Sequence, residues 1–239
     1  MGNYLKIGLT LMTFAIVVAI LLAAVYTITE EPIAIAELNV KLESIKTVLT
    51  DPVSGELLIE EKDIPQSQEK LNDKIWKESD GETLYESKTY NGYCASPAYK
   101  FSLKDGRTAY IINGASVGYG GYVTIMCSFI KGADSFEMLR LEVLDYSQET
   151  PGLGAKIAEE PVKERFFSIP EQGLAKGVKV DKDAGKNPAK TEEQEQNYKK
   201  EGIISISDLM TGATITPRGV ANAINTMNEY LEQTLGGDE

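Results

Sequence analysis

The chain has 239 residues, of which 42% are hydrophobic and 25% charged, so it can form one folded domain and still have residues left for an anchor. Its net charge of −12 and isoelectric point near 4.7 leave no basic surface for phosphate groups, so no nucleic-acid partner is expected. Histidine is absent and only two cysteines occur, which argues against a zinc or iron–sulfur site in this chain. Any redox chemistry would therefore use an organic cofactor.

The first predicted element is a transmembrane helix over residues 7–28. This stretch, IGLTLMTFAIVVAILLAAVYTI, has no charged side chain, and as an α-helix it would be about 33 Å long, enough to cross a bilayer core. The alternative is a cleaved signal peptide, but such peptides have a more basic start than the lone Lys6 and an apolar stretch of about 7–15 residues. Glu30 and Glu31 follow the helix, so the positive-inside rule places residues 1–6 in the cytoplasm and the main domain outside the cell (inner) membrane.

A membrane-proximal helix and linker are expected over residues 29–60, before a soluble domain over 61–239. The stretch IAIAELNVKLESIKTVL, which follows Pro32, has apolar residues at mixed helical spacings. The turn residues of DPVSGE at 51–56 are expected to end this helix.

An antiparallel meander is predicted in the middle of the chain. AYKFSL and RTAYIIN flank Asp105-Gly106, a favoured hairpin turn, and YVTIMCSFI, KGAD and FEMLRLEVLDY continue as strand, turn and strand. Cys94 and Cys127 lie in strand-like stretches, where they are expected either to form a disulfide or to remain buried free thiols.

The last part of the chain is predicted to hold a loop, a strand and a helix. Residues 181–200 carry five acids and five bases, which favours a solvated, flexible loop without chemistry, and GIISIS at 202–207 favours a strand. Thr216 is expected to be the N-cap of the final helix and Pro217 its first residue. The apolar face of this helix comprises Val220, Ala223, Ile224, Met227 and Leu231. The predicted fold class is α+β, an antiparallel sheet with flanking helices.

The turn that enters the last helix, DLMTGAT at 208–214, is the first candidate site. Helix N-termini expose unpaired N–H groups and a partial positive charge, so they suit a phosphate. Gly212 permits close backbone approach or a positive φ, Ala213 adds little bulk, and the hydroxyl of Thr214 would project near the phosphate, where it could be esterified. An ordinary capped turn is the alternative.

This segment resembles the Asp-x-x-(Ser/Thr)-Gly-Ala-Thr signature of the FMN-binding domain found in the G subunit of the Rnf complex and the C subunit of the Na⁺-translocating NADH:quinone reductase. About 60 residues earlier, ETPGLGAK from Glu149 to Lys156 is similar to the family's Glu-Thr-Pro-Gly-Leu-Gly stretch, and GYGG at 118–121 resembles the glycine turn before it. The order, the spacing and the single anchor agree with that family. One departure is DYSQ, which stands where many relatives have a histidine, so a proton-relay role for that histidine is not carried over.

The resemblance implies a covalently bound flavin. Thr214 matches the threonine joined to FMN through a phosphoester, and the signature that a flavin transferase recognises is matched by Asp208, Thr211, Gly212 and Ala213. Contacts with the cofactor are expected from Thr150, Gly152, Leu153, Gly154 and, at the phosphate end, Thr216. Glu149 is expected to hold its loop by a hydrogen bond. No residue is assigned a catalytic or metal-binding role.

The resemblance further implies an electron-relay subunit of an ion-translocating ferredoxin:NAD⁺ oxidoreductase of the Rnf type. Its expected partners are the other membrane and peripheral subunits of that complex, a flavin transferase for maturation, and the lipid bilayer. One alternative is the C subunit of the quinone reductase. The other is a membrane-anchored binding module without cofactor, in which Thr214 would only cap a helix.

Overall fold

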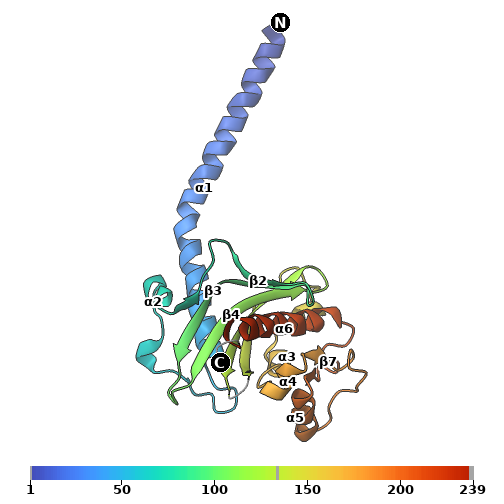
Figure 1. Cartoon of the computed structure of the whole chain (residues 1–239). Coiled ribbons are helices and arrows are strands. Elements are labelled where there is room, and N and C mark those ends of the chain that lie inside the picture. Colours follow the sequence, from blue (N-terminus) through green and yellow to red (C-terminus); the bar gives the residue numbers. More distant parts are fainter. Residues whose placement is uncertain (1, 133–134, 237–239) are drawn as a thin grey trace. The chain divides into compact units, whose positions relative to one another are not determined.

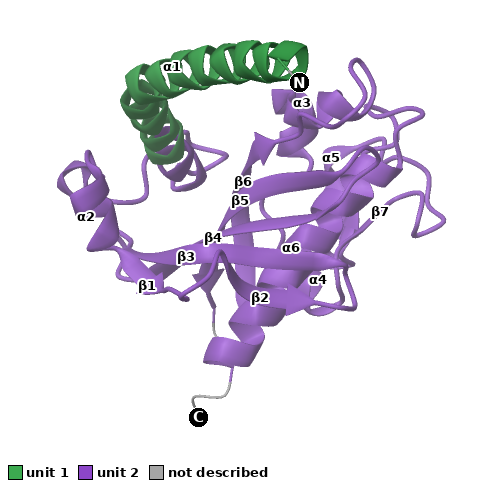
Figure 2. Cartoon of the chain, turned by 90° about the horizontal axis from the view of Figure 1, so that it is seen from above, with its two compact units in different colours: residues 1–42 green, residues 43–239 purple. Residues whose placement is uncertain are grey.

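The computed structural model of the protein describes residues 2–132 and 135–236. The chain divides into two compact units, residues 1–42 and residues 43–239, which are coloured separately in Figure 2. The second unit begins well before residue 61, where the sequence suggested that the soluble domain starts, because Ile45, Val48 and Leu49 are already buried in it.

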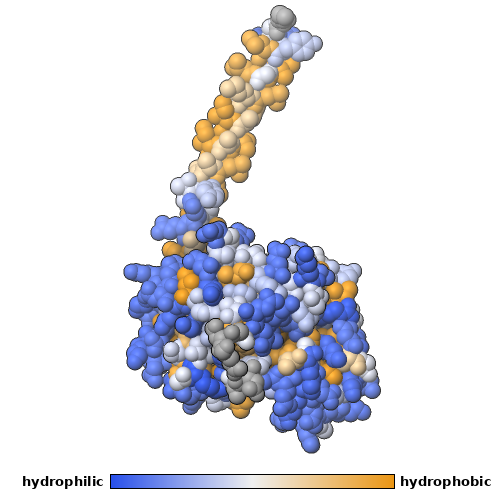
Figure 3. Space-filling view, in the orientation of Figure 1, coloured by the Kyte–Doolittle hydropathy of each residue, from blue (hydrophilic) through white to orange (hydrophobic). Residues whose placement is uncertain are grey.

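Helix α1 runs without interruption from Gly2 to Val48. Pro32 lies inside this helix, where it removes one backbone hydrogen bond without ending it. The helix is long and apolar enough to cross a membrane, and none of its most apolar window is buried within the protein. Figure 3 shows this apolar stretch in the first unit. The predicted stop after the helix is confirmed, because Thr50 and Leu57 pair across the turn at 51–56.

The centre of the second unit is a six-stranded antiparallel sheet in the order β1-β3-β4-β5-β6, with β2 also paired to β3. Figure 1 labels β2, β3 and β4 beside α6, and Figure 2 also labels β1, β5 and β6. The predicted meander is confirmed as β3 to β6, with Asp105 and Gly106 in the turn between β3 and β4. The strands are β1 (Ile75–Lys77), β2 (Thr83–Ser87), β3 (Gly92–Ser102), β4 (Thr108–Val117), β5 (Tyr122–Lys131) and β6 (Phe136–Asp145).

Helix α6, Ile215–Leu235, packs on strands β3, β4 and β5 and closes the main hydrophobic core. The predicted apolar face is confirmed, because each of its five residues is fully buried: Val220, Ala223, Ile224, Met227 and Leu231. Burying such side chains contributes about 1.5–3 kcal/mol for each of the larger ones. This packing fixes the position of the N-terminus of α6 at one end of the sheet.

A second set of buried apolar residues precedes the sheet. Ile45, Leu49, Ile59 and Leu71 are almost fully buried, and the N–H of Lys104, just after β3, donates to the carbonyl of Leu58. The short helices in this segment are η1 (Glu61–Asp63) and α2 (Gln68–Asn72).

Between β6 and α6 the chain forms short elements, and here one prediction was wrong. Residues 192–200 form a helix and not a loop, and Thr191 caps this helix by accepting a hydrogen bond from the N–H of Gln194.

The start of the predicted loop is not solvated either. Asp181 is fully buried and accepts three hydrogen bonds from Ile206 and Ser207. The elements are η2 (Gly154–Ala158), α3 (Glu160–Glu164), α4 (Glu171–Ala175), β7 (Lys179–Val180), α5 (Glu192–Lys200) and β8 (Ile203–Ile204). The strand expected at 202–207 is thus limited to two residues, which pair in parallel with β7.

The two cysteines are free thiols, so the disulfide alternative is not realised. Cys94 lies on β3 and Cys127 on β5, with β4 between them, and both are fully buried. Burial raises the pKa of both thiols, which keeps them in the neutral form.

Candidate cofactor site

The two sequence blocks meet in one cleft of about 450 Å³, although about 60 residues separate them in the chain. This volume lies within the range of about 300–1,000 Å³ that is typical of small-molecule sites. The first block contributes Glu149, Thr150, Leu153 and Gly154, and the second contributes Gly212, Ala213 and Thr214. The lining is completed by Tyr119, Ile215 and Thr216.

Three residues of the predicted site lie beside the cleft and do not line it. Gly152 is exposed and turns the backbone with φ 74°. Asp208 is exposed, and its carboxylate is 2.9 Å from the guanidinium of Arg165. Thr211 is exposed and donates its hydroxyl to the carbonyl of Ser207. Asp208 and Thr211 therefore stabilise the turn from outside the cleft, whereas Gly212 to Thr214 line it.

The turn that carries Thr214 has a backbone that only glycine adopts easily. Gly212 has φ 86°, in the left-handed region that side chains disfavour. The preceding Met210 is buried, and its carbonyl accepts a hydrogen bond from the N–H of Ala213. The core thus anchors one side of the turn, and Gly212 directs the chain into the start of α6.

Thr214 occupies the N-cap position of α6, which corrects the prediction that Thr216 would be the cap. The helix starts two residues earlier than expected, at Ile215, and Thr214 is already in the right-handed helical region, at φ −83° and ψ −29°. The side chain of Thr214 makes no capping hydrogen bond, and the ammonium of Lys182 lies 3.4 Å from its hydroxyl oxygen. The first turn of α6 contains no acidic residue of its own, and acidic residues in that turn are the ones that would oppose phosphate binding most directly.

Glu149 joins the three segments that form the cleft. Glu149 is only 5% exposed. One of its carboxylate oxygens accepts hydrogen bonds from the backbone N–H groups of Tyr119 and Gly120, at 2.8 and 3.4 Å. The other oxygen accepts from the hydroxyl of Thr216 at 2.5 Å. The hydrogen bond predicted for Glu149 is confirmed, and this residue ties both the glycine turn at 118–121 and the first turn of α6 to the first block.

Gly154 lets the first block approach Glu149 closely. A Cβ atom at this buried position would overlap the carboxylate of Glu149 and lie 2.8 Å from the hydroxyl oxygen of Thr216. No larger residue fits there unless these two side chains move, so the glycine is required for the shape of the cleft.

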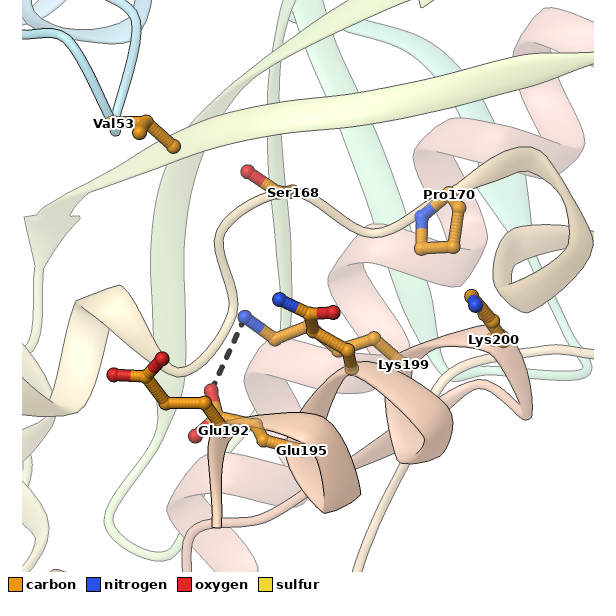
Figure 4. Close-up of a pocket in the computed structure, with 8 residues that line it drawn as sticks. Val53, Ser168, Pro170, Glu192, Glu195, Lys199 and Lys200 are labelled. Carbon is orange, nitrogen blue, oxygen red and sulfur yellow. Dashed lines mark ion pairs between the residues drawn. The ribbon is translucent and has the colours of Figure 1, made fainter.

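A second and larger hollow, of about 560 Å³, lies beside α5 (Figure 4). It is lined by Val53, Ser168, Pro170, Glu192, Glu195, Gln196, Lys199 and Lys200, and it contains none of the predicted site residues. The first turn of α5 holds Glu192, Glu193 and Glu195, whose charges oppose phosphate binding. Burial lowers the pKa of Lys199, while the carboxylate of Glu195, 3.3 Å away, acts in the opposite direction.

Within residues 2–132 and 135–236, no group of three or more Cys, Asp or Glu side chains is arranged to hold a metal ion. The cleft instead offers the uncapped hydroxyl of Thr214, the N-terminus of α6 and an apolar wall, with the ammonium of Lys182 beside Thr214 and the carboxylate of Glu149 held by hydrogen bonds. Such a set suits an organic phosphate with a planar apolar group.

Two family models match the chain. The model of the FMN-binding domain matches residues 118–229, a range that includes all residues of the cleft, and the model of the RnfG N-terminal region matches residues 2–48. A solved structure from Thermotoga maritima, assigned as an RnfG subunit of electron transport complex, is 37% identical, with a TM-score of 0.62. The match covers 81% of this chain and 96% of that one. The chain belongs to the RnfG family. A comparison with curated proteins gives no match.

These matches confirm the family that the sequence motifs resembled, and the observed sheet and flanking helices confirm the predicted α+β fold class. Membership of the RnfG family makes the chain an FMN-binding subunit of an electron transport complex. Sequence reasoning did not assign three residues that the structure places at the site. Tyr119 and Ile215 are adjacent to motif residues, which was a usable signal. Lys182 gave no such signal, since only the tertiary fold brings it to Thr214.

Proposed function

We propose that this protein is the G subunit of an Rnf-type ion-translocating ferredoxin:NAD⁺ oxidoreductase, and that it relays electrons through FMN joined to Thr214 by a phosphoester. The observation that carries this proposal is the meeting of both motif blocks in one cleft at the start of α6, where the hydroxyl of Thr214 makes no capping hydrogen bond. The match of residues 2–48 to the RnfG N-terminal region supports the Rnf assignment over the quinone reductase.

The chain's residues fit the phosphate of this cofactor. The N-terminus of α6 supplies a partial positive charge, and Lys182 supplies a full one within 3.4 Å of the Thr214 hydroxyl. An ester at Thr214 would therefore hold the phosphate between these two charges. We assign Thr216 to this end of the site, with its own hydroxyl engaged by Glu149.

The wall formed by Thr150, Leu153 and Gly154 fits a planar ring. Gly154 allows the backbone to come close, and Leu153 offers an apolar surface that is 45% exposed. When bound, FMN supplies one-electron and two-electron redox chemistry. Glu149 positions the wall against α6, and we assign it a positioning role and not a catalytic one.

A covalent link suits a domain outside the cell membrane. Cytoplasmic flavin cannot refill such a site by mass action, so non-covalent binding would have to be very tight. The ester removes this requirement and allows one side of the cleft to stay open. Residues 1–6 would then be cytoplasmic, and the ion path would lie in partner subunits, because one helix without an ionisable residue at its centre forms no channel.

Flavin attachment is tested by expressing the full chain in membranes with and without a flavin transferase. After denaturation and electrophoresis, we expect flavin fluorescence on the chain only when the transferase is present. A chain that carries no fluorescence in the presence of an active transferase would leave the cofactor-free binding module as the better account.

Orientation and complex membership have separate tests. Protease added to the outside of intact spheroplasts should digest the second unit, and protection of that unit would contradict the proposed topology. Neighbouring genes should encode a ferredoxin-like iron–sulfur subunit, whereas a quinone-reductase flavoprotein there would favour the C-subunit alternative.

A further inference from the structure

The described part of residues 43–239 exposes seven large apolar side chains, and six of them lie at the end of the sheet that holds the cleft. The exception is Val53, in the turn after α1. Hydrophilic residues otherwise cover most of the visible surface of this unit in Figure 3. We call the six residues the apolar rim: Val117, Tyr119, Tyr122, Tyr146, Leu153 and Ile215.

The apolar rim is continuous with the mouth of the cleft. Tyr119, Leu153 and Ile215 line the cleft and are 69%, 45% and 41% exposed. Val117 and Tyr122 are register partners at the end of the β4–β5 hairpin, whose turn carries Tyr119. Clustered exposed apolar side chains on a soluble unit indicate an interaction surface.

Aromatic residues outside the cleft lining extend the apolar rim. Tyr122 stacks edge-on against Tyr93, with ring centroids 5.4 Å apart. Tyr146 directly follows Asp145, the last residue of β6, which pairs with Thr124 of β5. Tyrosine is enriched at protein interfaces because it combines a large apolar surface with a polar tip.

Hydrogen bonds and close packing hold the apolar rim in place. The N–H of Tyr119 donates to buried Glu149, and the N–H of Gly118 donates to the carbonyl of Gly121 at 2.7 Å. A Cβ atom at Gly120 would overlap the backbone of Gln148, so the hairpin tip lies directly against the segment before Glu149. A surface that is ordered before binding loses little conformational entropy when a partner docks.

Two carboxylates beside the strand end of the apolar rim favour a protein over an anionic lipid surface, while Lys182 lies at its other end, near Ile215. Asp145 is exposed and directly precedes Tyr146. Glu82 is also exposed and lies beside β3, the strand of Tyr93, where its carbonyl accepts a hydrogen bond from the N–H of Ser96. Surfaces that bind anionic lipids carry lysine and arginine around their apolar residues. Acidic flanks oppose such lipids and attract basic groups on a protein.

We propose that the apolar rim is the docking surface for a redox-carrying protein subunit of the same complex, whose contact face is apolar with basic residues opposite Asp145 and Glu82. This inference rests on the proposed function, because an electron relay must bring a second redox centre close to the cleft. Three residues of the rim line that cleft, so a subunit docked on the rim would lie at the mouth of the cleft.

Photo-cross-linking in membranes that contain the assembled complex tests the surface directly. A photoreactive amino acid is placed at Tyr122, which is outside the cleft lining, and at Val53 as the control, which is 91% exposed. We expect a cross-link from position 122 to a subunit that binds a flavin or an iron–sulfur cluster, and none from position 53. A lipid adduct at position 122, no adduct there, or the same subunit at both positions would overturn the proposal.

A double variant tests the functional consequence. Val117→Ser with Tyr122→Ser removes two rim side chains that do not line the cleft, and Val53→Ser is the matched control. The double variant should slow electron transfer through the complex at least tenfold while its covalent flavin stays at the wild-type level. Unchanged electron transfer would refute the docking surface. Absence of flavin from the wild-type chain would refute the proposed function instead, so the two failures are distinguishable.

Discussion

Two hollows of the second unit, the one beside α5 and the cleft at α6, differ in size and in the charge at the helix N-terminus, and the smaller one has the properties of a phosphate site. The hollow beside α5 is larger, about 560 Å³ against about 450 Å³, but α5 begins with three glutamates. The first turn of α6 contains no acidic residue and has Lys182 beside it, and the one carboxylate in this cleft, that of Glu149, is engaged by Thr216 and by backbone N–H groups. Both helices have a threonine at the N-cap. The side chain of Thr191 makes a capping hydrogen bond in α5, whereas the side chain of Thr214 makes none in α6.

The volume of a hollow therefore does not identify the cofactor site, because the larger hollow contains none of the motif residues. The sign of the charge at the helix N-terminus, the availability of a hydroxyl and the close backbone approach at Gly154 all distinguish the α6 cleft. Each of these properties can be altered at one residue, with a matched residue elsewhere in the second unit as the control.

The two N-cap threonines should give the largest contrast. Thr214→Ala should abolish covalent flavin, because no hydroxyl remains for the ester. Thr191→Ala should keep the flavin at the wild-type level and destabilise the chain by about 1 kcal/mol, because only a helix cap is lost. In-gel flavin fluorescence and urea unfolding of both detergent-solubilised chains measure this. Flavin retained in the Thr214 variant would end the distinction between the two helices.

Adding a methyl group at Gly154 should have the next largest effect. Gly154→Ala forces a Cβ atom into the carboxylate of Glu149, and overpacking of this kind costs about 1–3 kcal/mol. We expect lower stability and less covalent flavin. Gly81→Ala is the control, since a Cβ atom there meets no atom within 4 Å. Equal stability of the two variants in urea would show that close approach at Gly154 is not required.

One carboxylate in each hollow can be neutralised. Glu149→Gln should lower the free energy of unfolding by about 1.5–3 kcal/mol, because a buried charged acceptor with three donors is lost. Glu195→Gln should cost about 1 kcal/mol or less, since its ion pairs with Arg165 and Lys199 are partly exposed. Urea unfolding gives both values. A larger loss for Glu195 would reverse the ranking.

A lysine beside the cleft can be compared with one that lines the other hollow. Lys182→Gln removes the charge nearest to Thr214, so flavin attachment should slow about two- to fivefold, which corresponds to about 0.4–1 kcal/mol. Lys199→Gln should leave the attachment rate unchanged. Time courses of flavin fluorescence with a fixed amount of transferase measure both rates, and equal slowing would assign the effect to net charge alone.

The smallest effect concerns pH. Burial lowers the pKa of Lys199 below its ordinary value of 10.5, so the folded state binds this proton less tightly than the unfolded state does. The free energy of unfolding therefore gains nothing from Lys199 below this lowered pKa. It increases as the pH rises through the lowered pKa, and the gain is complete at about the ordinary pKa. Lys199→Gln should lack this gain, which urea unfolding at neutral and alkaline pH can measure. A gain that persists in the variant would assign it to another group.

Local patterns were sufficient to predict the meander and the apolar face of α6. Alternation around Asp105-Gly106 and the spacing from Val220 to Leu231 each depend on residues that are near in sequence. The start of α6 was misplaced because Thr216 and Pro217 form a good local start signal, whereas Thr216 is held by Glu149, which is 67 residues away. Helix α5 was missed because its polar sequence shows no apolar periodicity.

The candidate site was predicted in its motifs but not in its assembly. The turn at 208–214 and the block from Glu149 could each be recognised, because glycines with special backbone requirements mark both. That Lys182 would face Thr214, or that Asp208 would pair with Arg165, depends on contacts across 32 and 43 residues. No local pattern encodes such contacts.

Peptide mass mapping of the full chain, purified from membranes together with its complex, tests the central claim most directly. The account predicts that the peptide containing Thr214 is heavier by the mass of FMN less one water, with the added mass on that residue. An unmodified Thr214 in an assembled complex that transfers electrons, or FMN attached to a different residue, would contradict it.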